Sequence, residues 1–191
     1  MPKQLIIVPG GNSFDSNDNY LEWLENSSIN LKTNQGWKYQ IQQDFTNLGW
    51  EVFYMDMPCS HNANFEEWSL AFQKILPLLS LDVVLVGHSL GGIFLASYLA
   101  QHNLKVKQLH LVAAPFERVG SFELPKILLR ANQNCDQINI WHSIEDSVVE
   151  FSESQKYLKH FPKAKLQKFV NKGHFNQNNF SELVDVIINI Y

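Results

Sequence analysis

Short apolar runs alternate with longer helical patterns along the chain. The runs are brief and rich in Val, Ile and Leu, which is typical of strands covered on both faces. The repeated order of strand and helix predicts an α/β fold, in which a parallel sheet has helices on both faces. The predicted strands span residues 4–8, 51–55, 83–86, 108–112, 138–142 and 166–170.

Helical patterns fill most of the intervening segments. Gly49 is a stop signal for the first long helix, and Asn64 and Ser147 are N-cap candidates for two later ones. A short helix is also expected around residues 20–25. It lies in a polar segment, 12–36, that is either a tolerated surface insertion or a functional loop. The predicted long helices span residues 37–48, 65–79, 90–102, 123–131, 148–160 and 180–190.

Composition narrows the classes of protein. A chain of 191 residues that is 45% hydrophobic can bury about one core, so a single domain over residues 1–191 is expected. The net charge is −4 and no basic cluster occurs, which argues against a nucleic-acid partner. Cys59 and Cys135 lack metal-binding spacing and fit a reducing compartment. No apolar run suits a signal peptide or a membrane span, so we expect a cytoplasmic protein.

One turn carries a specific chemical signal. The stretch DVVLVGHSLGG places Ser89 between an apolar strand and a helix, in the pattern G-x-S-x-G. In such a turn the serine is a nucleophile on a strained backbone, and Gly87 and Gly91 let strand and helix pass closely. The N–H of Leu90 would then face an oxyanion, and the side chain of His88 should project to the other side of the turn. The alternative is that Ser89 merely caps the helix.

A serine hydroxyl needs a base, and the base needs an acid to hold it. His174 follows the last predicted strand and precedes the last helix, which places it at the same sheet edge as Ser89. The acid should follow the preceding strand, so we favour Asp146. Glu145, its neighbour, and Glu117, one strand earlier, are the alternatives.

The first strand ends in LIIVPGGNS, where glycines allow close approach of the backbone to a ligand. Gly11 is therefore our choice for the second oxyanion donor, with Gly10 and Asn12 as alternatives. The motif also fits an ordinary Pro-Gly turn. Four aromatic residues either line an acyl pocket or pack in the core or at its rim: Phe14, Trp37, Phe116 and Phe122.

Together these residues resemble the α/β-hydrolase superfamily, and more closely its small, lidless retinoblastoma-binding protein 9-like (YdeN-like) serine hydrolases. The resemblance covers nearly the whole chain and includes IIVPGG, VVLVGHSLGG, SIEDSVV and KGHFNQNNFSELVDVI. It implies Ser89 as nucleophile, Asp146 as acid and His174 as base, on a six-stranded sheet of order 2-1-3-4-5-6. Two features depart from the pattern: the first strand ends in Pro9-Gly10 rather than His-Gly, and residues 12–36 are longer than the usual first loop.

The sequence therefore predicts a serine hydrolase that cleaves a small acyl ester, thioester or activated amide through an acyl-enzyme. The chemistry requires no metal and no organic cofactor. Residues 115–131 are too few for a large helical lid, which favours a small-molecule acyl substrate. The competing hypothesis is a non-catalytic module of the same fold that binds a protein partner.

Overall fold

The computed structural model describes residues 3–27 and 36–189. Its centre is a parallel sheet of six strands in the order β2-β1-β3-β4-β5-β6, which confirms the predicted α/β-hydrolase architecture. Every predicted strand is present, with ends shifted by up to three residues. The strands are β1 (Gln4–Val8), β2 (Glu51–Tyr54), β3 (Val84–His88), β4 (Val106–Val112), β5 (Cys135–Ser143) and β6 (Lys165–Phe169).

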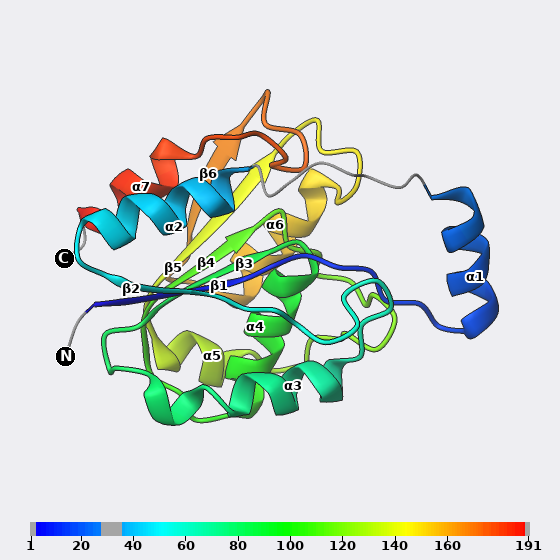
Figure 1. Ribbon diagram of the computed structural model, residues 1–191, viewed down its shortest axis with the longest axis horizontal. Coiled ribbons are helices and arrows are strands. Elements are labelled where there is room, and N and C mark those ends of the chain that lie inside the picture. Colours follow the sequence, from blue (N-terminus) through cyan, green and yellow to red (C-terminus); the bar gives the residue numbers. More distant parts are fainter. Residues whose placement is uncertain (1–2, 28–35, 190–191) are drawn as a thin grey trace.

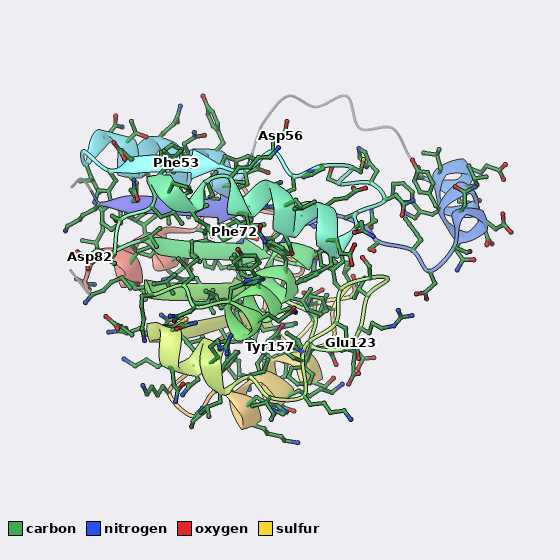
Figure 2. All side chains as sticks on the ribbon, turned by 90° about the horizontal axis from the view of Figure 1, so that it is seen from below. Phe53, Asp56, Phe72, Asp82, Glu123 and Tyr157 are labelled. Carbon is green, nitrogen blue, oxygen red and sulfur yellow. The ribbon has the colours of Figure 1, made fainter. Side chains whose placement is uncertain are left out.

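Helices cover both faces of this sheet (Figure 1). One face carries α2 (Trp37–Asn47) and α7 (Ser181–Ile188), and the other carries the remaining helices of the body. These are α3 (Phe65–Gln73), followed by a 3₁₀ turn at Leu76–Leu78, α4 (Leu90–Gln101), α5 (Leu129–Asn134) and α6 (Phe151–His160). Figure 2, viewed from this second side, shows Phe72 of α3 and Tyr157 of α6, both fully buried.

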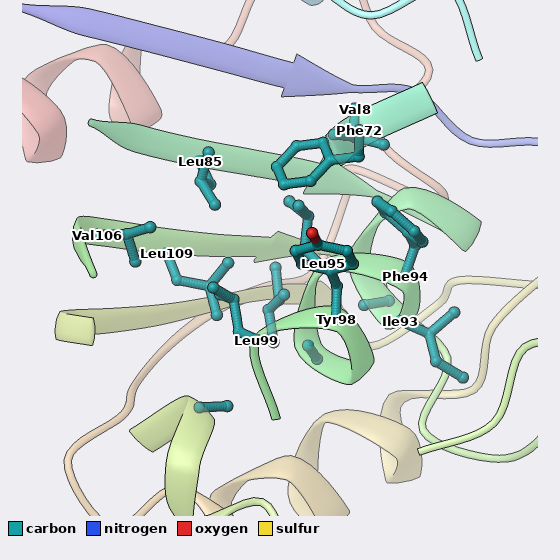
Figure 3. Close-up of a cluster of buried hydrophobic side chains, with 14 of the residues drawn as sticks. Val8, Phe72, Leu85, Ile93, Phe94, Leu95, Tyr98, Leu99, Val106 and Leu109 are labelled. Atoms are coloured by element: carbon teal, nitrogen blue, oxygen red, sulfur yellow. The ribbon is translucent and has the colours of Figure 1, made fainter. Parts of the chain in front are cut away.

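The helix that follows Ser89 is the centre of the larger core. α4 is apolar on all sides, and its residues from Leu90 to Leu99 are buried, as expected for a helix enclosed by other elements. Figure 3 shows Leu95 and Tyr98 of α4 beside the strands, and the ring of Phe72 from α3 packs edge-on against Tyr98, 5.0 Å between centroids. The start of α4, and with it Ser89, is therefore fixed by packing rather than by local sequence alone.

Three predicted helices have different limits in the structure. The helix predicted at 65–79 ends at Gln73 and gives way to the 3₁₀ turn, which contains Pro77. The helix predicted at 123–131 is wrong over most of its length: only Leu129–Asn134 is helical, and Pro125 disfavours helical geometry at Leu124, near the start of the predicted span. The helix predicted at 148–160 begins at Phe151, so Ser147 is not its cap.

The short helix expected around residues 20–25 exists and is longer, as α1 (Asn17–Asn26). Figure 1 shows it beyond one end of the sheet, and it contains no buried residue. Its aromatic rings contact Phe14 and His61, since Phe14 packs on Tyr20 and Trp23, and Trp23 stacks on His61. Residues 28–35 of the predicted loop segment lie outside the described residues.

The predicted N-cap and stop signals can be compared directly with the backbone. Asn64 accepts hydrogen bonds from Glu66 and Glu67 N–H, and Gly49 follows α2 with a φ of +80°, so both predictions are confirmed. The helix predicted at 180–190 is described as α7; residue 190 itself lies outside the described ranges. Across the described ranges, none of the helices combines the length and apolar character that a membrane crossing requires.

Candidate active site

Ser89 lies at the sharp turn between β3 and α4. Its backbone has φ 54° and ψ −122°, a conformation that a non-glycine residue rarely adopts and that costs about 1–3 kcal/mol. The turn is held by a hydrogen bond from Ser89 N–H to the Val112 carbonyl, 2.8 Å long. The hydroxyl makes no capping bond to the helix and lies instead 3.0 Å from His174 Nε2. The alternative in which the Ser89 side chain merely caps α4 is therefore excluded by this contact pattern.

Glycines make this turn sterically feasible. A Cβ on Gly87 would lie 2.5 Å from the Gly91 carbonyl oxygen, and one on Gly91 would collide with the carbonyl oxygens of Val8 and Pro9. The turn thus packs directly on the end of β1, as the close-approach argument from sequence expected. This contact brings the Pro9-Gly10-Gly11 segment beside Ser89.

His174 lies in the loop after β6 with its ring between Ser89 and Asp146. Nδ1 is 2.9 Å from Asp146 Oδ2, and Nε2 faces the Ser89 hydroxyl. If Nδ1 carries the proton and donates a hydrogen bond to the carboxylate, Nε2 has a lone pair directed at the hydroxyl. The ring is 11% exposed, so it is partly shielded from water yet accessible to a substrate.

Asp146 follows β5 and its side chain is fully buried. Its Oδ1 accepts the N–H groups of Val148 and Val149, at 2.9 and 3.0 Å, so the carboxylate caps a tight turn and also contacts His174. His142 lies behind it and donates from Nε2 to the Val149 carbonyl. Burial lowers the pKa of His142, which keeps that ring neutral.

The two alternative acids are placed elsewhere. Glu117 is exposed and pairs with Lys156, 2.6 Å away. Glu145 accepts hydrogen bonds from the Ser143 hydroxyl and from Gly173 N–H, and the bond from Gly173 is the main reason that its pKa is lowered. Neither carboxylate contacts the His174 ring, whereas Asp146 does.

The loop that carries His174 is fastened on both sides, which sequence reasoning missed. Ser143 Oγ accepts Lys172 N–H, and Trp37 Nε1 donates to the Phe175 carbonyl at 2.8 Å. Gly173 and Phe175 have φ values of +50° and +55°. A positive φ at Phe175 is strained for a bulky residue, so the surrounding contacts must hold the loop in this shape.

The end of β1 lies beside Ser89, where the sequence predicted the second oxyanion donor. A Cβ on Gly10 would be 3.1 Å from Ser89 Cβ, so only glycine fits there without a shift. Asn12 N–H already donates to the Ser60 carbonyl, 2.9 Å away, which removes it as an oxyanion donor. Gly11 and Leu90 both line the hollow beside Ser89, so their N–H groups stay our choice for the two oxyanion donors.

The hollow beside Ser89 has a volume of about 390 Å³. Phe14, Leu90, Pro115, Val119, Val148 and Val149 form its apolar wall, with Glu117, Arg118 and two further glutamates among its polar groups. Such a lining, mostly apolar with a few polar groups, is common for small-molecule sites. Within residues 3–27 and 36–189, no group of three or more His, Cys, Asp or Glu side chains could hold a metal ion.

The sequence left four aromatic residues open between lining an acyl pocket and packing, and the structure places them differently. Phe14 lines the hollow, but Trp37, Phe116 and Phe122 do not. Trp37 is buried under the His174 loop, and Phe122 is fully buried in the larger core. Phe116 packs its ring on Tyr157 and His160. Phe116 and Phe122 therefore serve packing. Trp37 also borders a second hollow, of about 280 Å³, whose lining includes Lys38, Gln42 and Tyr54.

Comparison with known proteins gives a consistent result. A family model described as serine hydrolase matches residues 29–186. The chain is 25% identical over 195 residues to serine hydrolase RBBP9 of Rattus norvegicus, covering 97% of this chain and 94% of that relative. The ydeN gene product of B. subtilis has a TM-score of 0.81 at 17% identity, with 98% of both chains covered. Est1E from Butyrivibrio proteoclasticus has a TM-score of 0.62 at 15% identity, covering 99% of this chain and 88% of that one.

The structural matches agree with the sheet order and confirm the α/β-hydrolase fold. The family model covers most of the chain, and it agrees with the resemblance to the YdeN-like branch. This protein therefore belongs to the serine hydrolase family and is an enzyme.

Proposed function

We propose that this enzyme hydrolyses a small acyl ester, with Ser89 as nucleophile, His174 as general base and Asp146 as the acid that orients it. One observation carries the proposal: an unbroken set of contacts from Ser89 Oγ to His174 Nε2, 3.0 Å, and from His174 Nδ1 to Asp146 Oδ2, 2.9 Å. Both distances are those of hydrogen bonds. The three residues follow β3, β5 and β6, so their proximity is a product of the fold.

The reaction follows from this arrangement. His174 Nε2 takes the proton of Ser89 as Oγ attacks the substrate carbonyl carbon, and Asp146 stabilises the resulting imidazolium. The N–H groups of Leu90 and Gly11 bind the oxyanion, and removing such a donor costs roughly 3–4 kcal/mol of transition-state stabilisation. His174 then protonates the leaving alcohol as the C–O bond breaks. Water, deprotonated by the same ring, releases the acyl group and restores Ser89.

The lining of the hollow favours a short acyl group. A volume of about 390 Å³ is near the lower end for small-molecule sites, which run from about 300 to 1,000 Å³. Its wall is apolar at Phe14, Leu90 and Val149, which suits an aliphatic or small aromatic acyl chain. Because the hollow is small, p-nitrophenyl acetate and butyrate should be better substrates than the palmitate ester. A thioester or an activated amide would use the same catalytic groups.

Ester hydrolysis by three variants tests the assignment. Ser89→Ala should abolish turnover, and Asp146→Asn should lower kcat by about 10²-fold or more because the ring loses its orienting carboxylate. Asp136→Asn is the matched control: it makes the same chemical change at an exposed ion pair with Lys107, and such pairs contribute about 0–1 kcal/mol. Its kinetics should equal those of the wild type.

Two results would contradict this proposal. If Asp146→Asn keeps near-normal hydrolysis while Glu117→Gln abolishes it, the acid is misassigned. If the folded wild type cleaves none of these esters and Ser89 does not react with acyl-like probes, a module that binds a protein partner becomes the better explanation. Circular dichroism of each variant separates loss of chemistry from loss of fold.

A further inference from the structure

The imidazole of His88 is fixed in one tautomer by its two neighbours. Its Nε2 is 2.9 Å from the backbone carbonyl oxygen of His174, and a carbonyl only accepts, so Nε2 carries the proton. Its Nδ1 is 2.9 Å from the amine of Lys38, which only donates, so Nδ1 is the acceptor. Burial, aided by the nearby Lys38 and His174, lowers the pKa of His88 well below its ordinary value. The ring is therefore neutral and oriented.

This ring connects the base to the strand that carries the nucleophile. His88 is the last residue of β3 and the covalent neighbour of Ser89. Its bond to the His174 carbonyl therefore links Ser89 and His174 by a route that does not use the hydroxyl. The other contacts of the loop, from Ser143, Glu145 and Trp37, come from β5, from the segment after it and from α2.

Among the described residues no carboxylate forms an ion pair with Lys38, and its one polar side-chain contact is the hydrogen bond to His88. Its amine also lies over the Trp37 ring, 5.5 Å from the ring centroid. Burying an amine without a carboxylate partner is costly, so the His88 and Trp37 rings are the groups that hold it in place. Without this donor the His88 ring could present an unprotonated nitrogen to the His174 carbonyl, which would repel it.

We propose that Lys38 and His88 form a positioning pair, in which Lys38 fixes the tautomer of His88 and His88 holds the backbone of His174 so that its ring stays aimed at Ser89. The inference rests on the proposed function of His174 as base. Neither residue touches the reacting atoms. Their effect is on the orientation of the base, and a misplacement of about 1 Å can cost as much as 10²-fold in rate.

Steady-state kinetics on p-nitrophenyl butyrate test this pair, with active sites counted by titration with a fluorophosphonate. Per titrated site, His88→Leu should lower kcat by roughly 10–100-fold with little change in KM, because it removes the bond to His174. His88→Gln keeps an N–H donor in reach of the carbonyl and should recover kcat to within about threefold of the wild type. A purely structural role for the ring would not give this rescue.

Lys38→Met provides a second variant in case His88→Leu does not fold. It should lower kcat by roughly three- to tenfold, since the His88 ring stays but loses its fixed tautomer. Gln42→Met is the matched control, because Gln42 lies on the same helix as Lys38 and lines the second hollow with it, but makes no hydrogen bond to His88. Its kcat should equal that of the wild type.

The outcomes distinguish a failure of the proposed hydrolase function from a failure of the Lys38–His88 positioning pair alone. A wild type that is neither labelled at Ser89 nor active overturns the proposed function, and this inference with it. An active wild type alongside Lys38→Met and His88→Leu proteins with kcat within about twofold per titrated site overturns the positioning pair alone. So does a loss that appears only in the number of titratable sites, because that reports unfolding rather than a misaligned base.

Discussion

At the scale of single residues, the site depends on side chains that each satisfy two partners. Asp146 accepts two backbone N–H groups and also contacts His174, and His88 accepts from one residue while donating to another. Such doubly committed groups have little freedom to reorient. This rigidity is what preorganised catalysis requires, because the cost of ordering the groups is met during folding.

The amine of Lys38 makes stability depend on alkaline pH. Burial lowers the pKa of Lys38 from 10.5 to about 8. Between these values the unfolded chain keeps a proton that the folded chain has released, so the free energy of unfolding rises with pH. The wild type should therefore gain stability relative to Lys38→Met as pH rises from about 8 to 10.5, while below that window the cost of the buried charge is fully present.

Urea unfolding of both proteins near neutral pH and at alkaline pH measures this difference. His88 stays neutral over the whole range, since its pKa is far below it. Tyr54 lines the second hollow with Lys38, and burial together with Asp56 raises the pKa of its hydroxyl, so the phenol stays protonated over most of the range. A difference that is constant or shrinks with pH would show that the amine is not buried as described.

At the scale of elements, the turn from β3 into α4 determines the position of Ser89, the proposed nucleophile. Its location was predictable because the G-x-S-x-G pattern follows an apolar strand and opens an apolar helix. Helix limits were less predictable. Pro125 disfavours a helix at Leu124, and Asp146 rather than Ser147 accepts the free N–H groups ahead of α6. When neighbouring residues can both cap a helix, the backbone geometry decides which side chain accepts the free N–H groups, and sequence spacing does not show that geometry.

Gly91→Ala is expected to disturb this turn and the end of β1 together. The added Cβ would lie 2.5 Å from the Pro9 carbonyl oxygen, so the segment bearing Gly10 and Gly11 must move. We expect a loss of about 1–3 kcal/mol in stability, with a large fall in kcat as the oxyanion donors shift. Thermal unfolding and ester hydrolysis measure the two effects.

Gly49→Ala serves as the control. It places a Cβ in open space at a φ of +80°, remote from the site, so it should lower stability by about 1 kcal/mol and leave kcat unchanged. Equal kinetics for the two variants would mean that the contact between the turn and β1 has no part in catalysis.

At the scale of the whole molecule, the site exists only because the sheet is complete. Ser89, Asp146 and His174 follow three different strands, and parallel strands bring their carboxyl ends to one edge. The order of serine, acid and histidine in the sequence predicted that these three side chains would lie together, and the structure places them in contact. The supporting contacts of Trp37, Lys38 and His88 were not predictable, because they join segments up to 138 residues apart. The sequence could not decide whether Trp37 and Phe122 line a pocket or pack in the core, because an aromatic side chain is common in both places.

The most direct test of the central claim is to map the residue that reacts with a fluorophosphonate, by mass spectrometry of peptides from the folded protein. The account predicts an adduct on Ser89 in the wild type, none in Ser89→Ala, and labelling slowed by about 10²-fold or more in Asp146→Asn. An adduct on a different residue, or a folded wild type that does not react at all, would contradict it.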